Sequence, residues 1–150
     1  MNKMTLLLLG LVLLAGCSKS NANRSKDFTH TGCAADTRAG WFGDDPSLLK
    51  LKYEDGGLRV TRTNATMNCS IKNGGIVCDV SVKGNVISYF VYEKNGVDVN
   101  CFCPVEEMSS VVTGLQEGKE YTLEYRCRAS ATVSFTFKKG LNKIIDLDSV

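Results

Sequence analysis

Apolar residues recur at every second position through much of the stretch from Leu48 to Phe137, and this alternation constrains the fold more than any other feature. In its first part, Leu49, Leu51 and Tyr53 alternate with lysines. Side chains two positions apart lie on the same face of a strand, so the pattern predicts strands with one buried face. Glycine-containing turn signals separate the stretches, which favours an antiparallel β-sandwich. The sequence therefore predicts an all-β domain.

The alternation divides the chain into a series of expected strands, at residues 48–53, 58–62, 67–71, 76–82, 86–92, 97–105, 121–127 and 132–138. The segment 86–92 is apolar at nearly every position, so we expect a central strand there that is covered on both faces. Residues 141–150 have weak periodicity, which leaves a final strand and a loose tail both open.

The N-terminus carries an apolar run of a different kind. Lys3 precedes the run, which is too short to cross a bilayer as a helix, and small residues follow where a signal peptidase would cut. We therefore predict a signal peptide over residues 1–16. Its end, Leu-Ala-Gly-Cys at residues 14–17, resembles the lipobox of bacterial lipoproteins. The resemblance implies a diacylglyceryl group on Cys17 and cleavage just before it.

The residues after Cys17 bear on the location of the protein. In enteric lipoproteins an aspartate after the cysteine retains the protein at the inner membrane, whereas Ser18 stands here, so this resemblance implies the outer membrane. Surface-exposed lipoproteins of Bacteroides-like bacteria often carry acidic residues just after the cysteine, whereas the segment 18–23 has none. This comparison favours the periplasmic face and leaves surface exposure open. The membrane is thus an expected partner through the lipid anchor.

Composition changes near residue 45 and indicates the domain organisation. Residues 17–45 are polar and rich in small residues without a sustained period, so we predict a lipid-anchored tether there. Residues 46–150 are expected to form one β-sandwich domain. His30, the only histidine, lies in the tether and is expected to be solvated, because a catalytic or metal site needs a rigid supporting shell. Trp41 and Phe42 are expected to pack on the edge of the domain.

Residues 112–123 carry a more specific pattern, in which a glycine turn at Gly118 lies between Leu115 and Tyr121. The pattern resembles the tyrosine corner between the fifth and sixth strands of fibronectin type III domains. The resemblance implies an immunoglobulin-like sandwich with a buried tyrosine whose hydroxyl bonds the backbone a few residues upstream. An ordinary hairpin with a core tyrosine is the alternative. Leu123 stands where antibody domains have a cysteine, so no antibody-type disulfide is expected.

A wider resemblance covers most of the mature chain. The lipobox, the Cys-Phe-Cys-Pro stretch at 101–104 and the Gly-Leu-x-x-Gly-x-x-Tyr run at 114–121 together resemble small cell-envelope lipoproteins of Bacteroides-like bacteria. This resemblance implies fold and location and no catalytic residues.

Six cysteines remain once Cys17 is set aside. Within the expected strands they stand two or four positions from apolar residues, so they are expected to lie on the inward face. In an oxidising envelope such cysteines are expected to form disulfides. Cys101 and Cys103, two apart on one strand, are expected to reach different neighbours, and Cys33 is expected to pin the tether to the domain. The disulfide candidates are Cys33, Cys69, Cys78, Cys101, Cys103 and Cys127.

Two alternatives to disulfides stay open. One is a metal-binding or thiol-redox cluster for zinc or copper, built from Cys69, Cys78, Cys101, Cys103 and Cys127. The absence of a Cys-x-x-Cys motif and of histidine after residue 30 weakens it. The other is that some cysteines stay free in the core, where they behave as small hydrophobic residues.

No set of residues predicts a reaction. With the one histidine in the tether, no histidine-based triad can be built, and the pairs Asp44-Asp45 and Glu106-Glu107 are expected to be solvated. The 18 lysines and arginines stand among 16 aspartates and glutamates, so we expect no nucleic-acid partner. We expect neither an enzyme nor a cofactor. The leading hypothesis is an adhesion or interaction module for a protein or glycan, with candidate contact residues Tyr89, Phe90, Tyr92 and Phe102.

Overall fold

The computed structural model describes residues 23–33, 45–71, 75–94 and 100–149. Almost all regular structure in these segments is β. The strands are β1 (Ser25–His30), β2 (Leu48–Glu54), β3 (Gly57–Asn68), β4 (Ile76–Lys83), β5 (Val86–Glu93), β6 (Phe102–Val112), β7 (Glu120–Arg126), β8 (Ser130–Thr136) and β9 (Asn142–Asp146). The C-terminal stretch thus contains a final strand, one of the two alternatives left open by its sequence.

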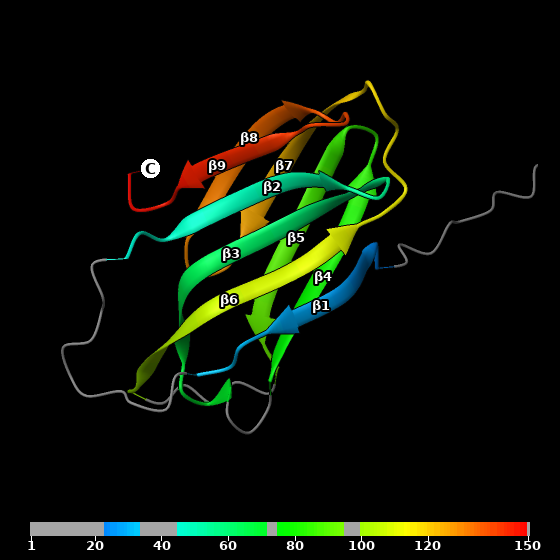
Figure 1. The fold of residues 1–150 in the computed structure, drawn as a ribbon. Coiled ribbons are helices and arrows are strands. Elements are labelled where there is room, and N and C mark those ends of the chain that lie inside the picture. Colours follow the sequence, from blue (N-terminus) through cyan, green and yellow to red (C-terminus); the bar gives the residue numbers. More distant parts are fainter. Residues whose placement is uncertain (1–22, 34–44, 72–74, 95–99, 150) are drawn as a thin grey trace, which may run out of the picture.

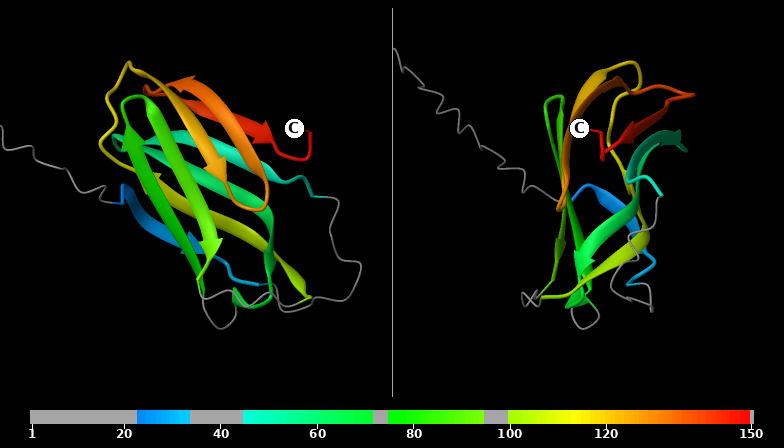
Figure 2. Two further views of the ribbon diagram at one scale, coloured as in Figure 1. Left: turned by 180° about the vertical axis from the view of Figure 1, so that it is seen from behind. Right: turned by 90° about the vertical axis from the view of Figure 1, so that its left-hand side faces the viewer.

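The strands form two packed sheets, and the prediction of an all-β sandwich is confirmed. One sheet has the order β1-β6-β3-β2-β9 and the other the order β4-β5-β7-β8 (Figure 1). The second view of Figure 2 shows the two layers in profile. The alternating apolar residues of both sheets meet between the layers and form one core, which includes Leu49, Leu51, Val60, Ile87, Tyr121, Leu123 and Phe135.

One pairing departs from the expected antiparallel arrangement. β5 and β7 run parallel, from Val86 opposite Thr122 to Phe90 opposite Arg126. The reason lies in the connection between them. The chain leaves β5, runs back as β6 in the other sheet, and then returns as β7, so β5 and β7 both run opposite to β6. The expectation of a wholly antiparallel sandwich is wrong at this position.

The first strand lies in the segment predicted to be tether. β1 pairs antiparallel with β6, and just before it the Arg24 N–H donates to the Val80 oxygen of β4 at 2.8 Å. The N-terminal segment therefore joins both sheets, and the folded domain begins before residue 46. A register shift between Lys26 and Thr29, together with a positive φ of 53° at Asp27, interrupts the period of two that would reveal this strand.

β3 is one long strand where the sequence predicts two. Asn64 has a φ of 52°, and the inward-facing parity changes there. Val60 and Arg62 are buried before it, and Ala65 and Met67 are buried after it. A left-handed residue within a continuous strand therefore mimics the break between two strands.

The crossover from β6 to β7 contains the predicted corner. Tyr121 is buried, and its hydroxyl oxygen accepts a hydrogen bond from the Gln116 N–H at 3.0 Å. Gly118 has a φ of 83°, which favours glycine, and Leu115 packs half-buried against the core. This bond fixes the chain where it passes from one sheet to the other.

Candidate interaction surface

Two disulfides tie the segments around the start of β6 to the domain. Cys33 pairs with Cys103, and Cys69 pairs with Cys101. Cys101 and Cys103 thus reach different partners, as predicted. The first disulfide fixes the end of β1, and the second joins the end of β3 to the residue before β6.

The remaining two candidates, Cys78 and Cys127, are free thiols, so the disulfide prediction is wrong for them. The Cys78 sulfur has hydroxyl groups around it, with Ser25 Oγ at 3.8 Å and Ser110 Oγ at 4.0 Å. The Cys127 sulfur lies 3.6 Å from Met67 Sδ. Parity placed both thiols toward the interior correctly, but it carries no information on the distance to another cysteine.

The same pairing is incompatible with a metal site built from all five cysteines. Cys69, Cys101 and Cys103 are bonded to other sulfurs and have no thiolate to offer. Among the described residues, no group of three or more histidine, cysteine, aspartate or glutamate side chains could hold a metal ion.

The predicted aromatic contact residues separate into two groups. Tyr89 faces the core, where it stacks on Tyr125 and hydrogen-bonds Ser110 Oγ at 2.8 Å. Burial raises the pKa of its phenol, which therefore stays neutral. Phe90 is 47% exposed and Phe102 42% exposed. The prediction of an outward Tyr89 is wrong, and so is that of a β5 covered on both faces.

The exposed rings, with two arginines, form one surface at the end of the β4-β5-β7-β8 sheet. Phe90 and Tyr92 stack with ring centroids 5.0 Å apart, and the Tyr92 hydroxyl donates to Asp79 Oδ2 at 2.9 Å. The Arg128 guanidinium lies 4.2 Å from the centre of the Phe102 ring, a cation–π contact between the β7–β8 turn and β6. We call Phe90, Tyr92, Phe102, Arg126 and Arg128 the aromatic–arginine surface.

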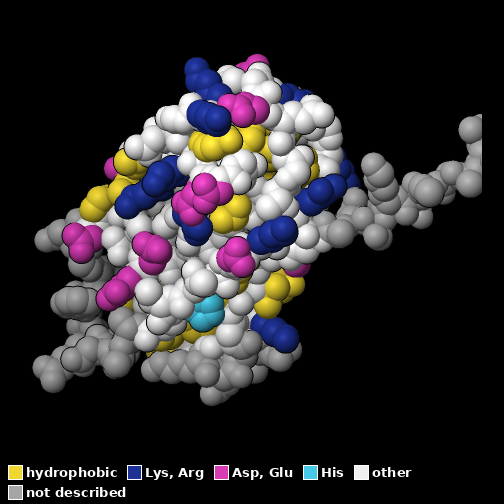
Figure 3. Space-filling model, turned by 45° about the vertical axis from the view of Figure 1, so that its right-hand side comes forward, with side chains coloured by type: hydrophobic (Ala, Val, Ile, Leu, Met, Phe, Trp, Pro, Cys, Tyr) yellow, Lys and Arg dark blue, Asp and Glu magenta, His cyan; other side chains and the backbone are white. Residues whose placement is uncertain are grey.

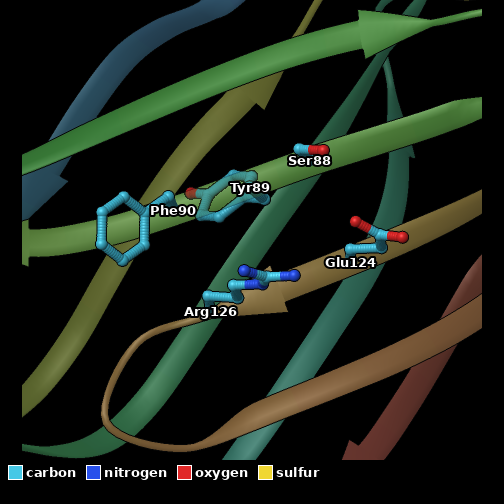
Figure 4. Close-up of a pocket in the computed structure, with 5 residues that line it drawn as sticks. All are labelled: Ser88, Tyr89, Phe90, Glu124 and Arg126. Atoms are coloured by element: carbon cyan, nitrogen blue, oxygen red, sulfur yellow. The ribbon is translucent and has the colours of Figure 1, made fainter.

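Two shallow hollows share Phe90 as a wall. The first, of about 280 Å³, is lined by Ser88, Tyr89, Phe90, Glu124 and Arg126. Figure 4 shows Phe90 of β5 beside Arg126 of β7, with Ser88 and Glu124 farther along the same strands. The second, of about 260 Å³, is lined by Met67, Phe90, Val91, Tyr92, Glu93, Cys127 and Arg128. Both are open to solvent, and their volumes lie just below the usual range for ligand pockets.

On the face that Figure 3 shows, lysines and arginines alternate with aspartates and glutamates. Glu106 and Glu107 are exposed on β6, and Asp45 is exposed before β2. His30 ends β1 with an exposed side chain, in ring contact with Phe28 at 5.9 Å.

Several predicted residues lie outside the described segments, namely Cys17, Trp41, Phe42 and Asp44. Within the segments described, no helix has the length and apolar character to span a membrane.

Arg128 and Arg126 are the functional candidates that sequence reasoning missed. They stand two residues apart in a short run that also contains Glu124, and nothing local indicates that Arg128 meets Phe102 across two elements. Comparisons of the chain with protein-family models, curated proteins and solved structures found no match.

Proposed function

We propose that the chain is a lipoprotein anchored through Cys17 to the outer membrane and facing the periplasm, with a non-enzymatic domain that binds a protein partner. The lipobox at residues 14–17 supports the anchor. The two disulfides fit an oxidising compartment, because such bonds persist mainly outside the cytosol. They also make the domain a rigid platform for binding.

We further propose a relation to fibronectin type III and immunoglobulin-like sandwiches. The bond between Tyr121 and the Gln116 N–H at the crossover supports it. The parallel pairing of β5 with β7 is a departure that any such relation has to accommodate.

The aromatic–arginine surface is the observation that carries the binding proposal. Exposed phenylalanines are costly in water, and two of them lie on one surface with arginines. Aromatic and arginine side chains dominate the energetic centres of protein interfaces. The neighbouring outer face of β8 offers only serines and threonines, so this end of the sheet is chemically distinct.

A capture experiment on native envelopes tests this proposal. The mature lipoprotein is cross-linked in its membrane as wild type, as F90S/F102S and as I144S. Ile144 is 58% exposed on β9 of the other sheet and serves as a matched control. We expect the wild type and I144S to capture the same partner, and F90S/F102S to lose it. Equal capture by all three proteins would remove this surface from the proposal.

A second experiment distinguishes a glycan ligand from a protein partner. The same three proteins are applied to an array of envelope polysaccharides. Binding that depends on Phe90 and Phe102 there, without protein capture, would overturn the protein partner in favour of a glycan. Labelling with a fatty acid, compared between wild type and C17A, tests the anchor independently of both.

A further inference from the structure

The second hollow, which we call the window, lies where the pairing of β5 with β7 ends, and Met67 of the opposite sheet contributes to its lining. β5 and β7 pair in register only as far as Phe90 and Arg126. β5 continues beyond this point, whereas β7 ends and the polypeptide turns back toward β8. In this turn the Cys127 N–H donates to the Ala129 oxygen at 2.9 Å. The gap between β5 and this turn is lined by outer residues of β5 and also by Met67, which belongs to the opposite sheet.

Two sulfur atoms line this window and come from different sheets. The Cys127 thiol donates a hydrogen bond to Met67 Sδ, and the two sulfur atoms lie 3.6 Å apart. Cys127 is a free thiol with a half-buried side chain, while Met67 is only 2% exposed. A thiolate and a thioether are both soft ligands, and their separation lets one ion bond both sulfurs after small side-chain rotations.

A buried hydroxyl lies beside the sulfur pair. Tyr125 is 1% exposed, and the one described group that its hydroxyl interacts with as a hydrogen-bond partner is the Cys127 thiol. Burial raises the pKa of this thiol, whereas the neighbouring Tyr125 hydroxyl favours the thiolate. The hydroxyl is therefore placed to donate to a thiolate at residue 127, which is a stronger acceptor than the neutral thiol.

We propose that Cys127 and Met67 form a binding site for one soft monovalent cation of the Cu(I) or Ag(I) class. On binding, the Cys127 S–H bond breaks and its proton passes to water, while bonds form from the metal to Cys127 Sγ and Met67 Sδ. Tyr125 donates a hydrogen bond to the metal-bound sulfur. The metal keeps its oxidation state. Two sulfurs do not provide the four ligands that a structural zinc site requires.

The test uses Ag(I), which needs no reductant and so leaves both disulfides intact. The mature chain is labelled with ¹³C at the methionine methyl groups and titrated with Ag(I). We expect one ion to bind and the Met67 methyl resonance to shift, while Met108, buried elsewhere in the core, stays unchanged. No variant is needed for this measurement, so it does not depend on the folding of a mutant.

Variants then separate the two ligands. M67L keeps the side-chain volume. It is expected to weaken Ag(I) binding by at least roughly tenfold, the smaller of the losses seen when the surroundings of a metal are changed. C127S is expected to abolish the binding, and C78S, which alters the other free thiol, to leave it unchanged. A Met67 resonance that does not move, equal affinity in M67L, or binding retained in C127S would each overturn the site.

Discussion

Lys143 of β9 donates a hydrogen bond from its ammonium group to the backbone oxygen of Ser134 in β8, at 3.0 Å. β8 is an edge strand, paired only with β7. The Phe137 N–H bonds the Lys119 oxygen on the β7 side, so even-numbered residues of β8 direct their backbone groups outward. A lysine from the other sheet therefore covers part of an otherwise open edge, one of the ways in which proteins prevent edge-to-edge pairing.

Replacing Lys143 by valine is expected to promote association through β8. The change removes both the bond to Ser134 and a positive charge that resists a second strand. Size-exclusion chromatography with light scattering, over a range of concentrations, measures the effect. The control is K139V, because Lys139 is an exposed lysine close by in the sequence. Identical elution of the two variants would refute this role of Lys143.

The tyrosine corner predicts a specific loss of stability in Y121F. The substitution leaves the ring in the core and removes only the acceptor of the Gln116 N–H. We expect the free energy of unfolding to fall by about 1 kcal/mol, the usual net value of a hydrogen bond. Urea denaturation measures it. Y53F, which also removes one phenolic oxygen while leaving the stacking on Phe137, is expected to change stability by less than about 0.5 kcal/mol.

The two disulfides are expected to contribute unequally. Cys33 and Cys103 are separated by 70 residues, and Cys69 and Cys101 by 32. Because a cross-link that closes a longer loop removes more entropy from the unfolded chain, C33A/C103A should lose about 0.7 kcal/mol more than C69A/C101A. Urea denaturation of both double variants provides the comparison. A larger loss in C69A/C101A would show that native contacts near β3 outweigh loop length.

Burial of Cys78 predicts a decline of stability at alkaline pH. Burial raises the pKa of this thiol above its ordinary 9.0. The contribution of the buried neutral thiol to the free energy of unfolding is fully present at pH values below the pKa of this thiol in the unfolded chain. It is lost as the pH rises from there through the higher pKa of the folded chain, because only the unfolded chain releases the proton readily. The free energy of unfolding, measured by urea titration on both sides of this window, should fall less steeply in C78A than in the wild type. Parallel slopes would contradict the assignment.

The buried Arg62 predicts a substitution that does not destabilise. Its guanidinium lies between the sheets and donates to Ser47 Oγ, while Nε and Nη1 have no acceptor among the described residues. Since an incompletely paired buried charge is costly, R62M should leave the free energy of unfolding unchanged or raise it by up to about 2 kcal/mol. R62A, which also leaves a cavity, should lower it. A loss of stability in R62M similar to that in R62A would show that the charge is well compensated.

The features of the fold that depend on residues close together in the sequence could be predicted from it. The period of two located most strands, and the spacing from Leu115 to Tyr121 indicated the crossover. The same period of two predicted different partners for Cys101 and Cys103, because side chains two positions apart on one strand project side by side from the same face. β1 was missed where a bulge at Asp27 breaks the period.

What the sequence did not predict depends on distance between elements. Cys78 and Cys127 face inward as predicted, yet no free partner lies within bonding reach of either among the described residues. Between Tyr89 and Tyr92 every residue is apolar or aromatic, so parity alone could not show which rings face the solvent. The contact of Arg128 with Phe102 exists only after the β7–β8 turn and β6, which belong to different sheets, are assembled.

Between β5 and β7, which pair in parallel, the chain passes through β6 of the opposite sheet. The two sheets therefore depend on each other for their assembly. β8 and β9, which finish the two layers, come last in the chain. A polypeptide that emerges N-terminus first therefore exposes unpaired apolar strands until almost its whole length is free. Such a topology makes early folding slow and a holding chaperone valuable during synthesis.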